Sequence, residues 1–249
     1  MTESGAKILF LVEGEKMEPK IMRHVLSVYG LDEKYDIVSY KTNIYGLYEI
    51  MFAEGHPEDW DLLQLMKGRA KEDDKTIFDA RYSDVVLIFD LEPQHPGFSE
   101  EKIREMVDYF VESSDMGKLY INYPMVESFY HMKSIPDPDY DSYEVSADEI
   151  YERGRYKSSV KKLCGCSSFA NFFRRIKTRE QCGLLIRQNL NKAKLLVNFD
   201  ITATNVLEQK HILGAELACW ENEEKIKVVC TCVFFIVDYN SAWISEAQW

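Results

Sequence analysis

Acidic residues stand directly after apolar runs at three places in the N-terminal half of the chain. Glu13 follows "ILFLV", Asp90 and Glu92 follow "VVLIF", and Glu127 lies just past "KLYINYP". Carboxylates that are crowded together cannot all stay ionised unless a cation lies among them. Their oxygen atoms suit Mg²⁺ or Mn²⁺, and two such ions can hold the attacking and leaving oxygens during phosphodiester hydrolysis. The spacing therefore indicates a metal-dependent site.

Each acidic motif also has a purely structural interpretation. A carboxylate that precedes a helix is stabilised by the positive end of the helix dipole, and for a single motif we favour this interpretation. Two buried strands that both end in acid favour the metal site instead. Asp90 and Glu92 are two residues apart, so on an extended chain their side chains share a face.

Four short apolar runs predict the strands that carry these acids, at residues 7–12, 35–42, 84–90 and 118–124. Apolar residues at helical spacing lie between the runs, and a further helix is expected to begin with "MVESFYHMK" at Met125. Alternation of strands and helices implies parallel strands with right-handed crossovers, and ligands bind such sheets at the carboxyl ends of the strands. We therefore predict an α/β fold with a parallel sheet of about four strands flanked by helices.

A polar segment rich in Pro and Asp, "SIPDPDYDSYEVSADE" at 134–149, predicts a boundary. We expect residues 1–135 to form the α/β domain with the acidic site and residues 150–249 to form a mainly helical, basic region. Residues 1–152 hold 15 Lys and Arg against 33 Asp and Glu, a net charge of −18, whereas residues 153–249 hold 15 against 9, a net charge of +6. Such a split predicts two surfaces with different roles.

The stretch from 153 to 179 contains no acid. Its cations are Arg153, Arg155, Lys157, Lys161, Lys162, Arg174, Arg175, Lys177 and Arg179. Lys and Arg neutralise phosphates, so this stretch indicates contact with RNA or DNA, and the alternative is a solvated helix face. Aromatic rings can stack on unpaired bases, but for Phe169, Phe172 and Phe173 we favour burial in the core.

The segments around the acids resemble the Toprim domain. The matching segments are "LFLVEGEKMEP", "VVLIFDLEP" and, more loosely, "NYPMVESFYH". The "EGEKxEP" wording is most similar to RloB-like proteins, and the family also includes the OLD-type nucleases of phage defence. The resemblance covers roughly residues 5–135 and implies a Toprim-like sheet there. It also implies that Gly14 lets the backbone turn sharply beside the first acid.

The same resemblance implies roles for the acids. Glu13 corresponds to the metal-bound or acid/base carboxylate, Asp90 and Glu92 to the paired metal ligands, and Glu18 and Glu127 to further acids of the site. The implied cofactor is Mg²⁺ or Mn²⁺. The family pattern is Asp-x-Asp, so Glu92 departs from it by one methylene, although its carboxylate still offers oxygen ligands.

By this resemblance we expect a Mg²⁺-dependent nuclease that hydrolyses phosphodiester bonds in RNA or DNA, with a role in phage defence. Relatives of this kind often act with an ABC-type ATPase. The chain has no P-loop signature, so the ATPase is expected to be a separate partner. The alternative is a non-catalytic module of the same fold that binds nucleic acid or a partner protein, and the Asp-x-Glu pair is its supporting feature.

The sequence also bears on whether the protein spans a membrane, is secreted or binds zinc. No apolar run reaches the roughly 18 residues of a membrane helix, and the N-terminus lacks a basic region followed by an apolar stretch. The six cysteines are expected to be reduced thiols of a cytoplasmic protein. Cys164/Cys166 and Cys230/Cys232 are spaced more closely than the usual zinc-binding pair, and "VVCTCVFF" indicates core.

Overall fold

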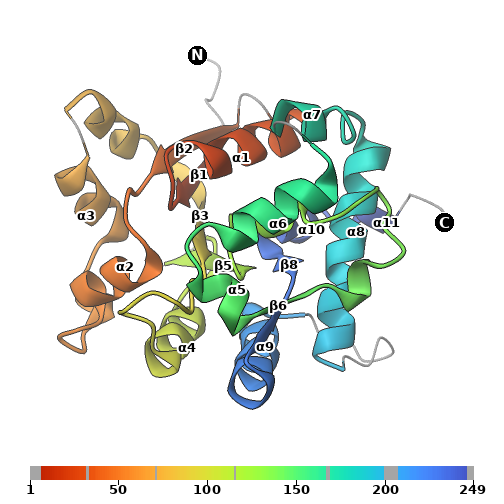
Figure 1. Ribbon diagram of the computed structural model, residues 1–249. Helices are drawn as coiled ribbons and strands as arrows, with labels where there is room; N and C mark the ends of the chain where they lie inside the picture. The colour runs from red at the N-terminus through yellow and green to blue at the C-terminus, as the bar shows by residue number, and fades with distance from the viewer. Residues whose placement is uncertain are drawn as a thin grey trace.

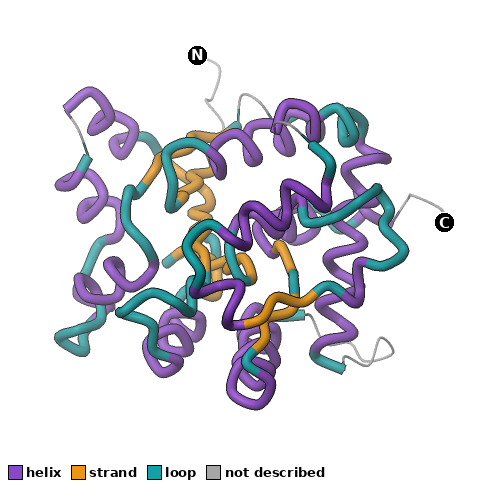
Figure 2. The backbone as a smooth tube through the Cα atoms, viewed as in Figure 1, coloured by secondary structure: helices purple, strands orange, loops and turns teal. Residues whose placement is uncertain are grey.

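The structure is a computed structural model that describes residues 7–31, 34–70, 72–114, 116–166, 169–198 and 207–245. Its centre is a six-stranded sheet with the strand order β2-β1-β3-β5-β4, and β8 also pairs with β5. The long strands are β1 (Lys7–Val12), β2 (Tyr35–Ser39), β3 (Tyr82–Asp90) and β5 (Gly117–Tyr123), and they run parallel. Figure 2 shows these strands in orange within a shell of purple helices.

All four predicted strands are confirmed. The runs in β1, β3 and β5 are apolar because helices cover both faces of the sheet there, which is typical of buried parallel strands. The sheet as a whole is mixed, because β4 (Val111–Glu112) and β8 (Val229–Cys230) are antiparallel to β5. A separate antiparallel pair is formed by β6 (Glu144–Ser146) and β7 (Lys225–Lys227).

Helices surround the sheet in Figure 1. The N-terminal part contributes α1 (Met17–Val28), α2 (Ile44–Met51), α3 (Leu62–Arg69) and α4 (Glu100–Tyr109). The C-terminal part contributes α5 (Ala147–Tyr151), α6 (Arg155–Cys164), α7 (Phe169–Phe173), α8 (Arg179–Leu196), α9 (Gln209–Glu223), α10 (Phe235–Tyr239) and α11 (Ala242–Ser245). The expectation of a mainly helical C-terminal region is met among the described residues, and 167–168, 199–206 and 246–249 lie outside them.

The helix expected to begin at Met125 does not form. Residues Val126–Tyr130 make only a short 3₁₀ turn. Every residue from 121 to 132 is buried, so this segment has no exposed face and packing on all sides determines its backbone. The turn is tight enough to aim Glu127 back toward the carboxyl end of the sheet.

The C-terminal region packs into the same core as the N-terminal strands. The ring of Phe235 in α10 meets the ring of Phe10 in β1 edge-on, with centroids 4.9 Å apart, and β8 extends the sheet beside β5. Residues from both sides of the predicted boundary therefore build one sheet.

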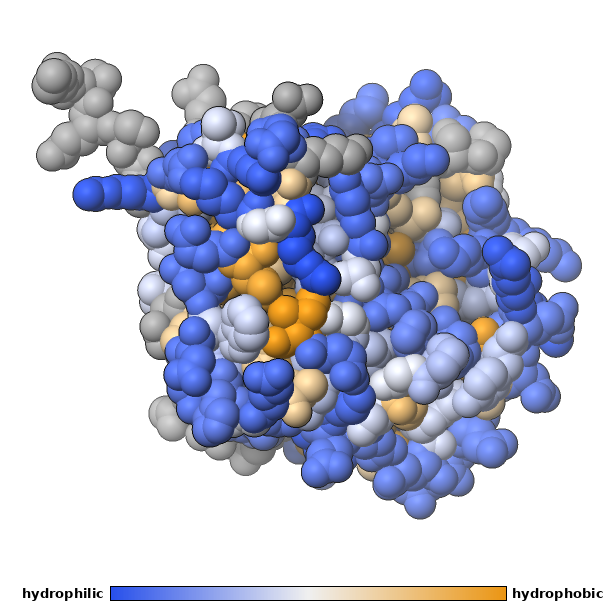
Figure 3. All heavy atoms as spheres, turned by 90° about the vertical axis from the view of Figure 1, so that its left-hand side faces the viewer, coloured by the Kyte–Doolittle hydropathy of each residue, from blue (hydrophilic) through white to orange (hydrophobic). Residues whose placement is uncertain are grey.

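The surface on the side of α2 and α3 is mostly hydrophilic. Figure 3 shows this side, with apolar side chains visible mainly in one hollow. Among the residues that the structure describes, no helix has both the length and the apolar character to cross a membrane.

Candidate functional site

A cleft of about 560 Å³ opens at the carboxyl ends of β1 and β3. The five acids predicted from the sequence all line it: Glu13, Glu18, Asp90, Glu92 and Glu127. Three lysines line it too, namely Lys16, Lys41 and Lys157. The expectation that the strand ends bring these carboxylates together is therefore met.

Glu13 and Asp90 are fixed by the sheet itself. Glu13 follows β1, and its Oε2 accepts a hydrogen bond from the backbone N–H of Asp90 at 3.1 Å. Asp90 is the last residue of β3 and is 6% exposed. Its Oδ1 accepts a hydrogen bond of 3.2 Å from Nδ2 of Asn122, which is the paired residue on β5. The neighbouring strands thus set the position of both acids.

Glu18 is buried in the first turn of α1 and packs against Gly14. A Cβ atom at Gly14 would lie 2.6 Å from Oε2 of Glu18, closer than real Cβ contacts. Gly14 is not among the described glycines with positive φ, so the site needs this glycine for space and not for a left-handed turn.

Glu92 lines the cleft with a backbone conformation that the sequence did not predict. β3 ends at Asp90, and Glu92 has a φ of 42°, in the left-handed region. The expectation that Asp90 and Glu92 share a face of an extended chain is therefore wrong. The backbone of Glu92 is held by hydrogen bonds from its N–H to Pro124 O at 3.1 Å and from His95 N–H to its carbonyl at 2.8 Å. The left-handed backbone conformation costs a residue other than glycine roughly 1–2 kcal/mol of conformational free energy, and these hydrogen bonds offset that cost.

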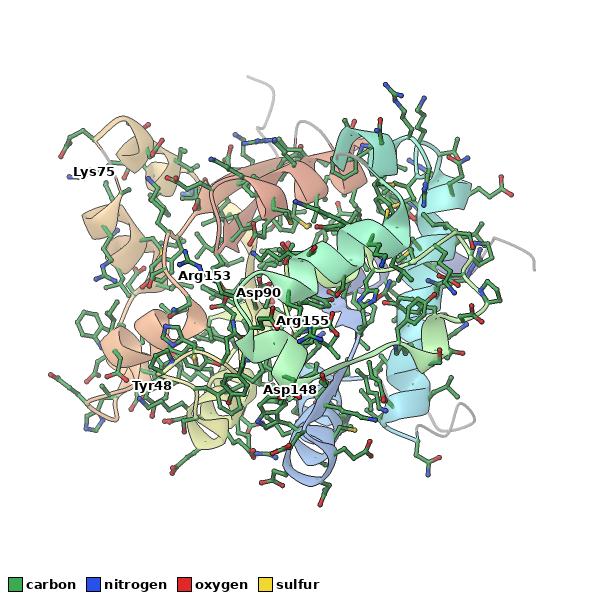
Figure 4. All side chains as sticks on the ribbon, in the orientation of Figure 1. Tyr48, Lys75, Asp90, Asp148, Arg153 and Arg155 are labelled. Atoms are coloured by element: carbon green, nitrogen blue, oxygen red, sulfur yellow. The ribbon has the colours of Figure 1, made fainter. Side chains whose placement is uncertain are left out.

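Glu127 is paired with a lysine from the basic stretch. The Glu127 side chain is 1% exposed, and its Oε1 lies 3.3 Å from Nζ of Lys157 on α6. Its Oε2 has no hydrogen-bond partner among the described residues. Figure 4 shows Asp90 close to the start of α6 in this view, with Arg153 just before this helix and Arg155 as its first residue. Lys157, which we assigned to nucleic-acid contact, therefore also belongs to the acidic cleft.

Burial and mutual repulsion raise the pKa values of the acids. Burial, followed by the charge of Glu92, raises the pKa of Glu13 to about 8. Burial, followed by the charge of Glu13, raises the pKa of Asp90 well above its usual range. Burial is also the main reason that the pKa values of Glu18 and Glu92 are raised. Near neutral pH the cleft therefore holds protons that a cation can replace.

Lys157 carries the opposite charge into this cleft. Burial lowers its pKa, but the charge and hydrogen bond of Glu127 outweigh burial, so the pKa of Lys157 is raised. The ammonium group thus stays protonated beside the acids and neutralises part of their charge.

The chemistry of the cleft fits Mg²⁺ or Mn²⁺, although the ligands are not fully assembled. The candidate donors are carboxylate oxygens, and one of them, Oε2 of Glu127, is buried without a partner among the described residues. Over the described ranges, however, no three His, Cys, Asp or Glu side chains are already arranged to hold a metal ion. The acids share a cleft, and a shift of side chains is needed to bring three of them onto one ion.

The other cations of the basic stretch differ in what they contact. Arg175 and Arg179 stabilise the fold: Arg175 donates to the carbonyls of Lys133 and Cys164 at 3.0 Å each, and Arg179 donates to the carbonyl of Tyr29 at 2.8 Å. Arg155 pairs with Glu152 at 2.7 Å on the surface. The exposed side chains that remain for nucleic acid are Arg153, Lys161, Lys162, Arg174 and Lys177.

The phenylalanines of this stretch lie mainly in the core. Phe172 is 0% exposed, and Phe173 is partly buried and stacks on His24 with ring centroids 4.4 Å apart. The side chain of Phe169 lies outside the described residues. Burial is therefore confirmed for Phe172, and the cations alone carry the prediction of nucleic-acid contact.

Comparisons of the chain with protein-family models, with curated proteins and with solved structures find no match. The resemblance to the Toprim domain thus rests on the quoted motifs.

Proposed function

We propose that this protein is a metal-dependent nuclease that hydrolyses phosphodiester bonds in RNA or DNA. The observation that supports this proposal is the meeting of five carboxylates, from three separate segments of the chain, in one open cleft beside exposed cations. Bound Mg²⁺ or Mn²⁺ would supply a water of lowered pKa and neutralise charge on the phosphate. The resemblance to RloB-like and OLD-type proteins supports a role in phage defence with a separate ABC-type ATPase.

The burial of the acids divides their roles. Asp90 and Glu127 are almost completely buried and hydrogen-bonded or ion-paired, so they are the fixed ligands. Glu13 and Glu92 are more open to the cleft. The pKa of Glu13, raised to about 8, allows this side chain to hold or release a proton near neutral pH.

The cations of α6 extend from the cleft along the surface. Arg153 precedes the helix, and Lys157 and Lys161 are four residues apart on α6, so the two lysines share a face. The side chain of Lys157 is 55% exposed, which leaves it free to turn from Glu127 toward a phosphate oxygen. The exposed Arg153 and Lys161 would then hold neighbouring phosphates of the same strand.

The second candidate is a non-catalytic module that binds nucleic acid or a partner protein. The incomplete metal geometry and the ion pair between Lys157 and Glu127 favour this alternative. A cleft whose negative charge is partly neutralised by its own lysine has less need of a cation. The two candidates differ in whether a divalent ion leads to strand cleavage.

The test is cleavage of labelled single- and double-stranded RNA and DNA with Mg²⁺, Mn²⁺ or EDTA. We expect cleavage only with a divalent ion, and Glu13→Gln and Asp90→Asn should each reduce it about 100-fold or more. Glu101→Gln, which changes an exposed acid of α4, is the matched control and should cleave like the wild type.

Two results would contradict the nuclease. Mn²⁺ binding without cleavage of any of these polymers would support the non-catalytic module. Absence of both cleavage and any Mn²⁺-dependent rise in melting temperature would exclude the metal site as well.

A further inference from the structure

Asn122 lies directly behind Asp90 and is completely buried. It belongs to β5, is 0% exposed and is the residue paired with Asp90 in the parallel register of β3 and β5. Its Nδ2 donates to Oδ1 of Asp90 at 3.2 Å. A buried amide is costly unless its polar atoms are bonded, so the reason for an asparagine in the apolar run "KLYINY" has to lie in these bonds.

The orientation of this amide is fixed from the opposite side. Oδ1 of Asn122 accepts from the backbone N–H of Cys232 at 3.3 Å and from Sγ of Cys230 at 3.4 Å. A backbone N–H can only donate, so the amide oxygen has to face Cys232 and the NH₂ group has to face Asp90. The two cysteines are themselves buried and adjacent, with their Sγ atoms 3.3 Å apart.

Asp90 is consequently held at two points. The Asn122 amide holds Oδ1, and the backbone N–H of Asp90 is occupied by Glu13. A carboxylate whose rotamer is fixed in this way presents its oxygens to the cleft at constant positions, which a metal ligand requires.

We propose that Asn122 is a positioning residue for the metal-dependent hydrolysis, acting through Asp90, and that Cys230 and Cys232 hold its amide in the required orientation. This inference rests on the proposed nuclease function. It adds a residue that touches neither the metal nor the substrate, and it gives a role to the thiol of Cys230 and to the backbone N–H of Cys232.

The main test compares Asn122→Leu with Thr231→Val. Thr231 is also completely buried beside β5, and its Oγ1 donates to the carbonyl of Ile121 at 2.7 Å, so both variants lose buried hydrogen bonds in the same place. We expect Asn122→Leu to weaken Mn²⁺ binding about 10–100-fold and to lower kcat by a similar factor, with the KM for nucleic acid unchanged. Thr231→Val should keep the Mn²⁺ affinity of the wild type.

A milder variant covers the case in which Asn122→Leu does not fold. Cys230→Ala removes one of the two donors to the amide oxygen, and Cys230→Ser keeps a donor at that position. We expect Cys230→Ala to weaken Mn²⁺ binding a few-fold and Cys230→Ser to restore it.

The outcomes separate this inference from the nuclease proposal. Wild-type affinity and kcat in Asn122→Leu or, if that variant does not fold, in Cys230→Ala would overturn the positioning role while the nuclease stands. Equal losses of Mn²⁺ affinity in Asn122→Leu and Thr231→Val would overturn it too, because the effect would then be one of general stability. A wild-type protein that neither binds Mn²⁺ nor cleaves nucleic acid would overturn both proposals.

Discussion

Oε2 of Glu13 accepts a hydrogen bond from the backbone N–H of Asp90 at 3.1 Å, across 77 residues of sequence. The acid that follows one strand is thereby fixed by the backbone of the next, and the parallel register of β1 and β3 sets its position. Sites that regular strands hold are more precise than sites that lie on loops.

The buried acids of the cleft should contribute a loss of stability to the metal-free protein as the pH rises from about 4.5 to about 8. Burial, then repulsion by Glu92, raises the pKa of Glu13 from 4.5 to about 8. Within this window the folded state keeps a proton that the unfolded chain has already released, so a rise in pH favours unfolding. The raised pKa values of Asp90, Glu18 and Glu92 act in the same direction. Melting temperatures measured across the window with EDTA present check this prediction.

Two controls accompany the pH series. Glu13→Gln should flatten the fall in melting temperature, because an amide does not titrate. Saturating Mg²⁺ should raise the melting temperature more at the upper end of the window, since binding requires ionised carboxylates. An equal pH dependence of the melting temperature in the wild type and in Glu13→Gln would contradict the raised pKa of Glu13.

Replacing Lys157 by Met should destabilise the metal-free protein by about 1–2 kcal/mol. The change removes the cation that pairs with the buried carboxylate of Glu127 and leaves that charge without compensation. Mg²⁺ should recover more stability in this variant than in the wild type, because the ion then takes over the role of the lysine. Chemical denaturation with and without Mg²⁺ measures both effects.

Lys161→Met is the matched control for Lys157→Met. It changes an exposed lysine one helical turn later on α6 and should alter the free energy of unfolding by less than about 0.5 kcal/mol. Equal effects of the two substitutions would show that the ion pair with Glu127 contributes nothing.

Gly14→Ala should abolish metal binding and cost about 1–3 kcal/mol of stability. The new Cβ would lie 2.6 Å from Oε2 of Glu18, so the buried carboxylate has to leave its position. Gly68→Ala in α3 is the comparison, since nothing lies within 4 Å of a Cβ there. That change should stabilise the protein by up to about 1 kcal/mol. Calorimetric titration with Mn²⁺ and thermal melts distinguish the two glycines.

The neighbours Arg174 and Arg175 should respond differently to replacement by Ala. Arg175→Ala removes hydrogen bonds to the carbonyls of Lys133 and Cys164 and should cost about 1–3 kcal/mol of stability. Arg174 is exposed, so Arg174→Ala should leave stability unchanged and lower the salt dependence of nucleic-acid binding by about one charge. Binding measured over a salt series, beside chemical denaturation, tests this pair. Loss of stability in Arg174→Ala would contradict the division of the basic stretch.

Much of the sheet could be predicted from the sequence because its long strands are continuous apolar runs. The convergence of Glu13, Asp90 and Glu127 followed from the rule that parallel strands end at one edge. The segment after Pro124 was predicted wrongly as a helix. Its residues are buried on every side, so apolar and polar residues do not alternate with a period that would indicate the backbone conformation. Local propensity does not determine such a segment, and contacts from distant parts of the chain do.

Two residues of the site were assigned incompletely or missed. Lys157 looked like one cation among nine, because its ion pair with Glu127 depends on how α6 crosses the sheet. Asn122 begins the quoted segment "NYPMVESFYH", but it was given no role in the site. The sequence did contain a signal for this residue. A single amide in an otherwise apolar strand needs a buried hydrogen-bond partner, and this strand ends near the acids, which are possible partners.

The antiparallel pairing of β8 with the end of β5 also affects when the cleft can form. Asn122 and Cys230 are 108 residues apart, and contacts of such separation form late in folding because the entropy of closing a long loop has to be overcome first. During synthesis, a chain that stops before β8 contains every acid of the cleft but lacks the residues that hold Asn122. On the proposed function, hydrolytic competence would therefore arise only after β8 has left the ribosome.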